Sequence, residues 1–232
     1  MVAYRFDDSR AGSVAANHLA NYRGILQVDG YAGYNRLAGP EGANDGAILA
    51  GCWAHARRKF YELHANGSSP FATRVVETMA PLWAIEEEIR GQSATTRADI
   101  RRQRSAPIVA DLFSMLEKEL PRLSGKSRLA EAIRYALHRR AVFGRFLDDG
   151  RIEIDSNIVE RAIRPQAILR KNALFAGSDG GGRTWATIAT LLMTARLNAV
   201  DPQAWLTQTL QRLANGWPHS RIDELMPWNY QT

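Results

Sequence analysis

Hydrophobic periodicity changes part-way along this chain, and that change most constrains the possible fold. Two short apolar runs rich in branched residues, "ILQVD" at 25–29 and "AILAGCW" at 47–53, predict buried β-strands. From about residue 53 to residue 150 the apolar residues instead recur three and four positions apart, which is helical spacing. The chain is therefore expected to open as mixed α/β and to continue with a long helical stretch.

Proline and capping residues refine this picture. Within the helical stretch, a break or kink is expected near Pro107, because proline disrupts a helix interior. After it, "SNIVERAIR" predicts a helix capped by Asp155 or Ser156 and limited by Pro165. Possible strands lie at 1–6 and within 150–155. The glycine run 180–182 predicts a mobile loop. A further helix is expected to start at Asp201–Pro202 and to end at Gly216.

Composition bounds the class of protein. The 232 residues carry a formal net charge of +6 with a pI near 9.8, which favours a polyanionic partner such as nucleic acid. A single cysteine, Cys52, excludes an intrachain disulfide. The opening residues "MVAYRFDDSRAG" lack the apolar core of a signal peptide, and no apolar run approaches the length that crosses a membrane, so a cytoplasmic protein is expected.

Acidic and basic residues gather in two places that could hold a metal beside a phosphate. Asp29 follows a predicted strand, where it could face a site at the sheet edge or simply cap the next turn. Glu160 could bind a metal ion, or form a surface ion pair with Arg164 four residues later. Carboxylates suit Mg²⁺, which keeps water and takes further ligands from phosphate oxygens. Possible phosphate-binding side chains nearby are Arg161, Arg164, Arg170 and Lys171.

Other candidate positions have simpler explanations. Cys52 and His55 are spaced as half a zinc site, but no second cysteine exists, so packing at a strand-to-helix junction is expected. Basic clusters at 56–60, 101–104 and 134–140 are read by default as solvated helix faces. Their number also suggests an electrostatic footprint for DNA.

Several stretches taken together resemble one known family. They are "LQVDGYAGYNRL", "GCWAHARRKFYEL", "DGRIEIDSNIVERAIRP", "RKNALFAGSDGGG", "TARLNAVDPQAWL" and "LMPW". In order and spacing they are similar to the transposases of insertion sequence 66, from about residue 2 to residue 228.

That resemblance implies a fold, a site and a reaction. The fold is a ribonuclease-H-like α/β core, incomplete at its N-terminus, with a large all-helical insertion. Its segments are 1–52 (first part of the core), 53–150 (insertion), 151–193 (remainder of the core) and 194–232 (C-terminal helical element). Asp29 and Glu160 match two catalytic, metal-binding acids of a DDE-type transposase. Mg²⁺ or Mn²⁺ is the implied cofactor, and transposon-end and target DNA, bound by a homo-oligomer, are the implied partners.

The match also departs from the family pattern. The family's first catalytic aspartate lies upstream of a segment resembling "AYRFDDSRAG", so its role is not transferred to Asp7 or Asp8. An N-terminally truncated transposase with impaired strand transfer is therefore expected. Two alternatives stay open: a non-catalytic DNA-binding or assembly module, and a helical interaction protein with charged surfaces.

Overall fold

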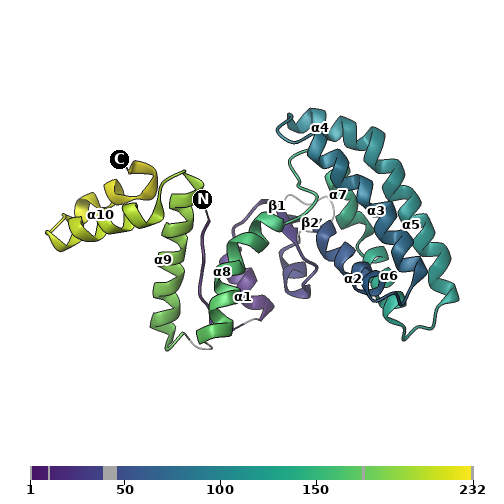
Figure 1. Cartoon of the computed structure of the whole chain (residues 1–232), viewed down its shortest axis with the longest axis horizontal. Coiled ribbons are helices and arrows are strands. Elements are labelled where there is room, and N and C mark those ends of the chain that lie inside the picture. Colours follow the sequence, from purple (N-terminus) through teal and green to yellow (C-terminus); the bar gives the residue numbers. More distant parts are fainter. Residues whose placement is uncertain (1, 10, 39–45, 174–175, 231–232) are drawn as a thin grey trace. The chain divides into compact units, whose positions relative to one another are not determined.

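The computed structural model describes residues 2–9, 11–38, 46–173 and 176–230, with the side chains of Arg170 and Ala173 also left aside. They form two compact units (Figure 1). One unit comprises residues 11–157. The other joins residues 2–9 to residues 158–230.

The unit 11–157 is built on a two-stranded parallel sheet. Strand β1 (Gly24–Val28) pairs with β2 (Ala47–Gly51) in a register that sets Gly24 opposite Ala47 and Val28 opposite Gly51. Both strands confirm the predictions from the branched apolar runs. Because the strands are parallel, their carboxyl ends meet at one edge of the sheet, so Asp29 and Cys52 leave the sheet at that edge. Helix α1 (Gly12–His18) precedes β1, and the 3₁₀ helix η1 (Ala32–Leu37) follows it.

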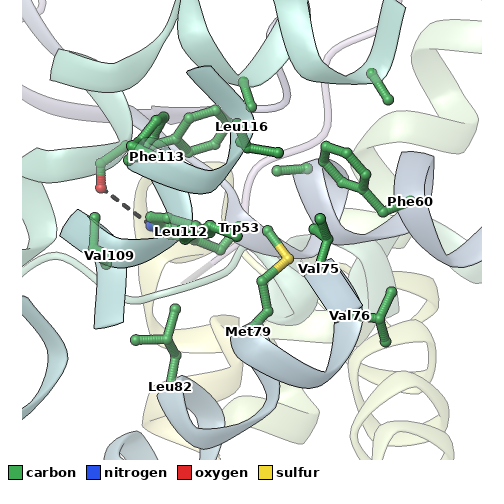
Figure 2. Close-up of a cluster of buried hydrophobic side chains, with 14 of the residues drawn as sticks. Trp53, Phe60, Val75, Val76, Met79, Leu82, Val109, Leu112, Phe113 and Leu116 are labelled. Carbon is green, nitrogen blue, oxygen red and sulfur yellow. Dashed lines mark hydrogen bonds between the residues drawn. The ribbon is translucent and has the colours of Figure 1, made fainter. Parts of the chain in front are cut away.

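Helices then enclose an apolar core on which the sheet rests. Trp53 is fully buried among the side chains of this core (Figure 2), and its indole N–H donates to the carbonyl oxygen of Phe143 at 3.1 Å. The clustered core residues fall between 50 and 154, so this unit holds the main core. The helices are α2 (Trp53–Ala65), α3 (Pro70–Glu88), α4 (Ala94–Ile100), α5 (Ala106–Glu119), α6 (Arg128–Leu137) and α7 (Arg140–Asp148).

The break expected near Pro107 is confirmed. A π-helical turn, η2 (Arg101–Ser105), joins α4 to α5 immediately before that proline. Pro107 has no N–H to donate, and its ring crowds the carbonyl four residues earlier, so a wider turn is favoured there. The turn places Arg101 inside the protein, against the carboxylate of Glu86 at 2.6 and 2.7 Å. For Arg101 the default expectation of a solvated face was therefore wrong.

The segment 150–155 is not the strand that its sequence allowed. Ile152 and Ile154 are buried and Glu153 is exposed, so buried and exposed side chains alternate here as they would in a strand. Its contacts with the sheet region are isolated hydrogen bonds instead of a ladder. The Trp53 N–H donates to the Ile154 carbonyl at 2.9 Å, and the Gln27 side chain donates to the Glu153 carbonyl at 2.7 Å.

The second unit consists of helices and one extended segment. Its helices are α8 (Asn157–Ala173), whose first residue belongs to the other unit, α9 (Asp179–Leu197), α10 (Pro202–Ala214), η4 (His219–Leu225) and η5 (Pro227–Asn229). Residues 2–9 run beside α9 (Figure 1), with the Tyr4 N–H donating to the Thr190 hydroxyl at 2.9 Å. The described residues 2–6 are not the strand that the sequence allowed, and Tyr4 forms its hydrogen bonds with α8 and α9 instead of with a neighbouring strand. The Asp201 cap and the Gly216 stop are confirmed.

Two expectations in this unit were wrong. Pro165 lies inside α8 and does not end it. Helical geometry is disfavoured but not forbidden for the residue before a proline, and both Arg164 and Pro165 are exposed. The glycines 180–182 belong to the first turns of α9 and not to a loop, with the Ser178 hydroxyl accepting from the Gly181 N–H at 3.1 Å. A Cβ on Gly182 would come within 2.4 Å of the Phe6 ring, so close packing explains that glycine.

None of the described helices is both long enough and apolar enough to span a membrane.

Candidate active site

Asp29 is the first residue after β1, at the carboxyl edge of the sheet, and its side chain is exposed. One carboxylate oxygen, Oδ1, accepts from the Tyr31 N–H at 2.9 Å, which closes the turn. Oδ2 has no hydrogen-bond partner among the described residues. The capping role and the metal-binding role considered from the sequence are therefore compatible, because they use different oxygens.

A tyrosine from the helical part of the unit also stabilises this turn, through a hydrogen bond to its backbone. The Tyr135 hydroxyl, on α6, donates to the Asp29 carbonyl oxygen at 2.7 Å. The next carbonyl, that of Gly30, accepts from the Arg139 guanidinium at 3.1 Å. Two residues distant in sequence, Tyr135 on α6 and Arg139 just after that helix, thereby fix the backbone that carries the Asp29 carboxylate.

The electrostatics around Tyr135 are mixed. The Arg139 guanidinium carbon and the Lys59 ammonium lie 4.4 and 4.7 Å from the centre of the Tyr135 ring. Burial raises the pKa of the Tyr135 hydroxyl; the charge of Arg139 opposes that rise and the charge of Asp29 adds to it. The phenol therefore stays protonated near neutral pH and keeps donating to the Asp29 turn.

Helix α8 carries the other acidic candidate and its cations. Glu160 lies in the first turn of this helix and is exposed. At 100° per residue, Arg164 and Lys171 fall on the same face of α8 as Glu160, and Arg161 is offset from it by about a quarter turn. These three cations are exposed and form no ion pair with any described residue. The Glu160–Arg164 surface pair is thus not formed, and the side chain of Arg170 is outside the described residues.

The structure places the two candidate acids in different units. Asp29 belongs to the unit 11–157 and Glu160 to the unit with residues 158–230, so their pairing at one metal site stays a prediction. Within the described ranges, no three His, Cys, Asp or Glu side chains gather into a group that could hold a metal. The free oxygen of Asp29 nevertheless fits one ligand position of Mg²⁺, which commonly binds one or two carboxylates and keeps water.

Asp155 and Cys52 have structural roles. Asp155 accepts from the Asn157 N–H at 3.0 Å, as expected for a residue that caps α8, and from the Trp83 indole N–H at 2.9 Å. The Cys52 sulfur is buried and accepts from the Ser156 N–H at 3.3 Å. The expectation of packing at a strand-to-helix junction is confirmed for Cys52.

Sequence reasoning missed Tyr135 and Arg139, which had been grouped with the basic cluster 134–140. Nothing in the local pattern links them to residue 29, more than a hundred positions earlier. The position of Tyr135 among apolar residues on an otherwise basic helix was the available signal.

Comparison with known proteins shows the family of the chain. The family model described as "Transposase IS66 family" matches residues 1–184. The chain belongs to the IS66 transposase family. A second model, the IS66 C-terminal element, matches residues 190–228, which overlaps the segment 194–232 expected to be the C-terminal helical element and begins four residues before it.

Three relatives of this IS66 family member come from Sinorhizobium fredii (strain NBRC 101917 / NGR234). "Uncharacterized protein y4qI" is 61% identical over 100% of this chain and 43% of its own length. "Uncharacterized protein y4jD" is 42% identical over 99% of the chain and 46% of its own length, and "Uncharacterized protein y4hP" is 38% identical over 98% and 43%. The chain thus spans less than half the length of these relatives. No solved structure matches it.

Proposed function

We propose that this chain forms part of the catalytic machinery of a transposase that cuts DNA and joins the cut strand to a target. The observation that supports the proposal best is the Asp29 turn. An exposed carboxylate with one free oxygen stands at the carboxyl edge of a parallel sheet, held there by Tyr135 and Arg139. The family membership supplies the reaction class.

Asp29 and Glu160 would together hold Mg²⁺ or Mn²⁺ in this proposal. A bound divalent cation supplies charge neutralisation and alignment for phosphodiester displacement. The parallel pairing of β1 with β2 and the acid at its edge support a ribonuclease-H-like core, with α2 to α7 as the helical insertion. The cations of α8 would contact DNA phosphates beside Glu160. Charge–phosphate contacts of this kind fix the register of a protein on DNA.

The first test measures Mn²⁺ binding and DNA nicking by the same variants. We expect Mn²⁺ titration calorimetry to show weaker binding in Asp29→Asn and in Glu160→Gln. The residual nicking of DNA carrying insertion-sequence ends, expected of a chain with an impaired site, should disappear in both. Asp111→Asn, which neutralises an exposed carboxylate on α5, is the matched control and should behave as wild type. Unchanged Mn²⁺ binding in both site variants would refute the assignment of the acids.

A second candidate function is a DNA-binding or assembly module without catalysis. It is favoured by three exposed cations on one helix, Arg161, Arg164 and Lys171, which form no ion pair with any described residue. Salt-sensitive binding of duplex DNA, with no nicking under any divalent cation, would support this candidate over the first.

A further inference from the structure

A pocket outside the acidic site lies between α2 and α3. Its volume is about 420 Å³, within the range of ligand sites. Ala54 and Ala80 leave room at its base, and larger side chains surround the space. These are Arg57, Arg58 and Tyr61 from α2, Trp83 from α3, and Asn157, the first residue of α8.

The pocket holds two arginines without counter-ions. Neither Arg57 nor Arg58 forms an ion pair or a hydrogen bond with any residue in the described ranges. Arg97 and Arg101, by contrast, pair with Glu153 and Glu86. An uncompensated pair of guanidinium groups around a cavity is suited to an anion, and guanidinium geometry suits phosphate in particular.

Aromatic rings form the rest of the wall. The Arg57 guanidinium carbon lies 5.0 Å from the centre of the Tyr61 ring and 5.9 Å from that of Trp83. The Trp83 indole N–H is bonded to Asp155 at 2.9 Å, so this ring is fixed in place. Tyr61 is 44% exposed, which leaves a face of its ring open for a planar group to stack on.

Asn157 adds a polar hydrogen-bonding side chain to the lining of the pocket. Its side-chain N–H donates to the Asp155 carboxylate at 2.7 Å, and its amide oxygen has no partner among the described residues. The pocket thus combines cations, a stacking surface and a free acceptor. A phosphate linked to a heteroaromatic base with amino groups matches all three features, and a nucleotide is that molecule.

We propose that this pocket binds one unstacked nucleotide of the DNA substrate, with Arg57 and Arg58 at its phosphate and Tyr61 against its base. The inference rests on the proposed function, because that function makes DNA the substrate. The inference also names the residues that would contact one nucleotide. One of them, Asn157, is the first residue of α8, and Glu160 follows it three residues later in the same helix. The base must be unstacked from its neighbours, since a base inside a duplex has no free face, so single-stranded DNA is the preferred form.

The test uses the full chain and fluorescently labelled oligonucleotides at low salt. For a single-stranded oligonucleotide we expect Tyr61→Ala to weaken affinity about 5- to 150-fold, the range for loss of one base–aromatic stack. Tyr61→Phe should retain affinity, and affinity for a duplex of the same length should change little. Arg58→Ala should weaken binding and reduce the salt dependence by about one phosphate contact, whereas Lys118→Ala, an exposed cation on α5, should not.

Specific results would overturn the inference. Equal single-strand affinity in wild type and Tyr61→Ala, with both chains showing the same thermal unfolding, would remove the stacking role. Displacement of the oligonucleotide by micromolar deoxyadenosine monophosphate would make a free nucleotide the ligand instead of DNA. Mn²⁺ binding separates this inference from the proposed function, because Tyr61→Ala should leave it intact and Asp29→Asn should not.

Discussion

Gly30 is the residue that allows Asp29 and Tyr135 to meet. Its φ of 91° is in the left-handed region, where glycine is strongly preferred. A Cβ at this position would come within 2.6 Å of the Tyr135 hydroxyl oxygen. That same hydroxyl donates to the Asp29 carbonyl. A side chain at residue 30 would therefore strain the backbone and also displace the group that holds the candidate catalytic acid.

We expect Gly30→Ala to lower the free energy of unfolding by more than Gly67→Ala does. Gly67 also has a positive φ, of 68°, but open space surrounds it, so alanine there adds only the backbone strain of about 1–2 kcal/mol. Overpacking against Tyr135 should add about 1–3 kcal/mol at residue 30. Urea unfolding of both variants measures the difference, and Gly30→Ala/Tyr135→Phe should recover part of it. Equal losses at residues 30 and 67 would contradict the close packing described here.

At the scale of elements, the segment 150–156 is attached by side chains more than by backbone. Glu153 accepts two hydrogen bonds of 2.8 Å from the Arg97 guanidinium on α4. The hydrogen bond from Arg97 lowers the pKa of the Glu153 carboxyl below its usual 4.5, against the opposing effect of burial. A lowered pKa in the folded state means that the carboxylate form is stabilised by folding.

This contact should make part of the stability depend on acid pH. The contribution is present above the ordinary glutamate pKa and is lost as the pH falls through the lowered folded-state value. Glu153 is 59% exposed, so the effect is modest. We expect wild type to melt at a higher temperature than Glu153→Gln at about pH 6, with the gap closing toward about pH 3. Glu87→Gln, on the exposed side of α3, should follow wild type. A gap that stays constant with pH would exclude this linkage.

Helices and strands with strong local sequence signals could be predicted, whereas the tertiary contacts between residues distant in sequence could not. The strands at 24–28 and 47–51 follow from branched apolar runs, and Pro107 predicted an interruption of the helix near the π-turn, although not its π form. Pro165 and the glycines before Arg183 were misleading signals, because a helix can continue through an exposed proline and because Gly182 packs closely against Phe6. Contacts such as Tyr135 with Asp29 join distant residues, and neither residue's neighbours in sequence encode the pairing. The acid at a strand end could therefore be found, but not the residues that position it.

At the scale of the whole molecule, the two units differ in how much apolar surface they bury. The clustered core lies within residues 50–154 and includes fully buried Trp53, Phe113 and Phe143. In the unit with residues 158–230, the buried apolar side chains among the described residues are Ala186, Ala195, Trp205, Leu225 and Pro227. Three of the apolar side chains of α8, Ile158, Val159 and Ile168, are more than half exposed. Stability should therefore be unevenly distributed along the chain.

Amide hydrogen exchange on the full chain measures that distribution. Opening free energies scale with local burial, so amides in α2, α3 and α5 should exchange slowest, at rates set by global unfolding. Amides in α8 should exchange faster, because few buried contacts must break to open that helix. DNA with Mn²⁺ should slow exchange in α8 selectively if its cations and Glu160 bind the substrate, and Glu160→Gln should reduce that protection. Equal protection of α5 and α8 in the free protein would contradict the uneven core, and unchanged exchange in α8 on adding DNA would remove this helix from the substrate-binding surface.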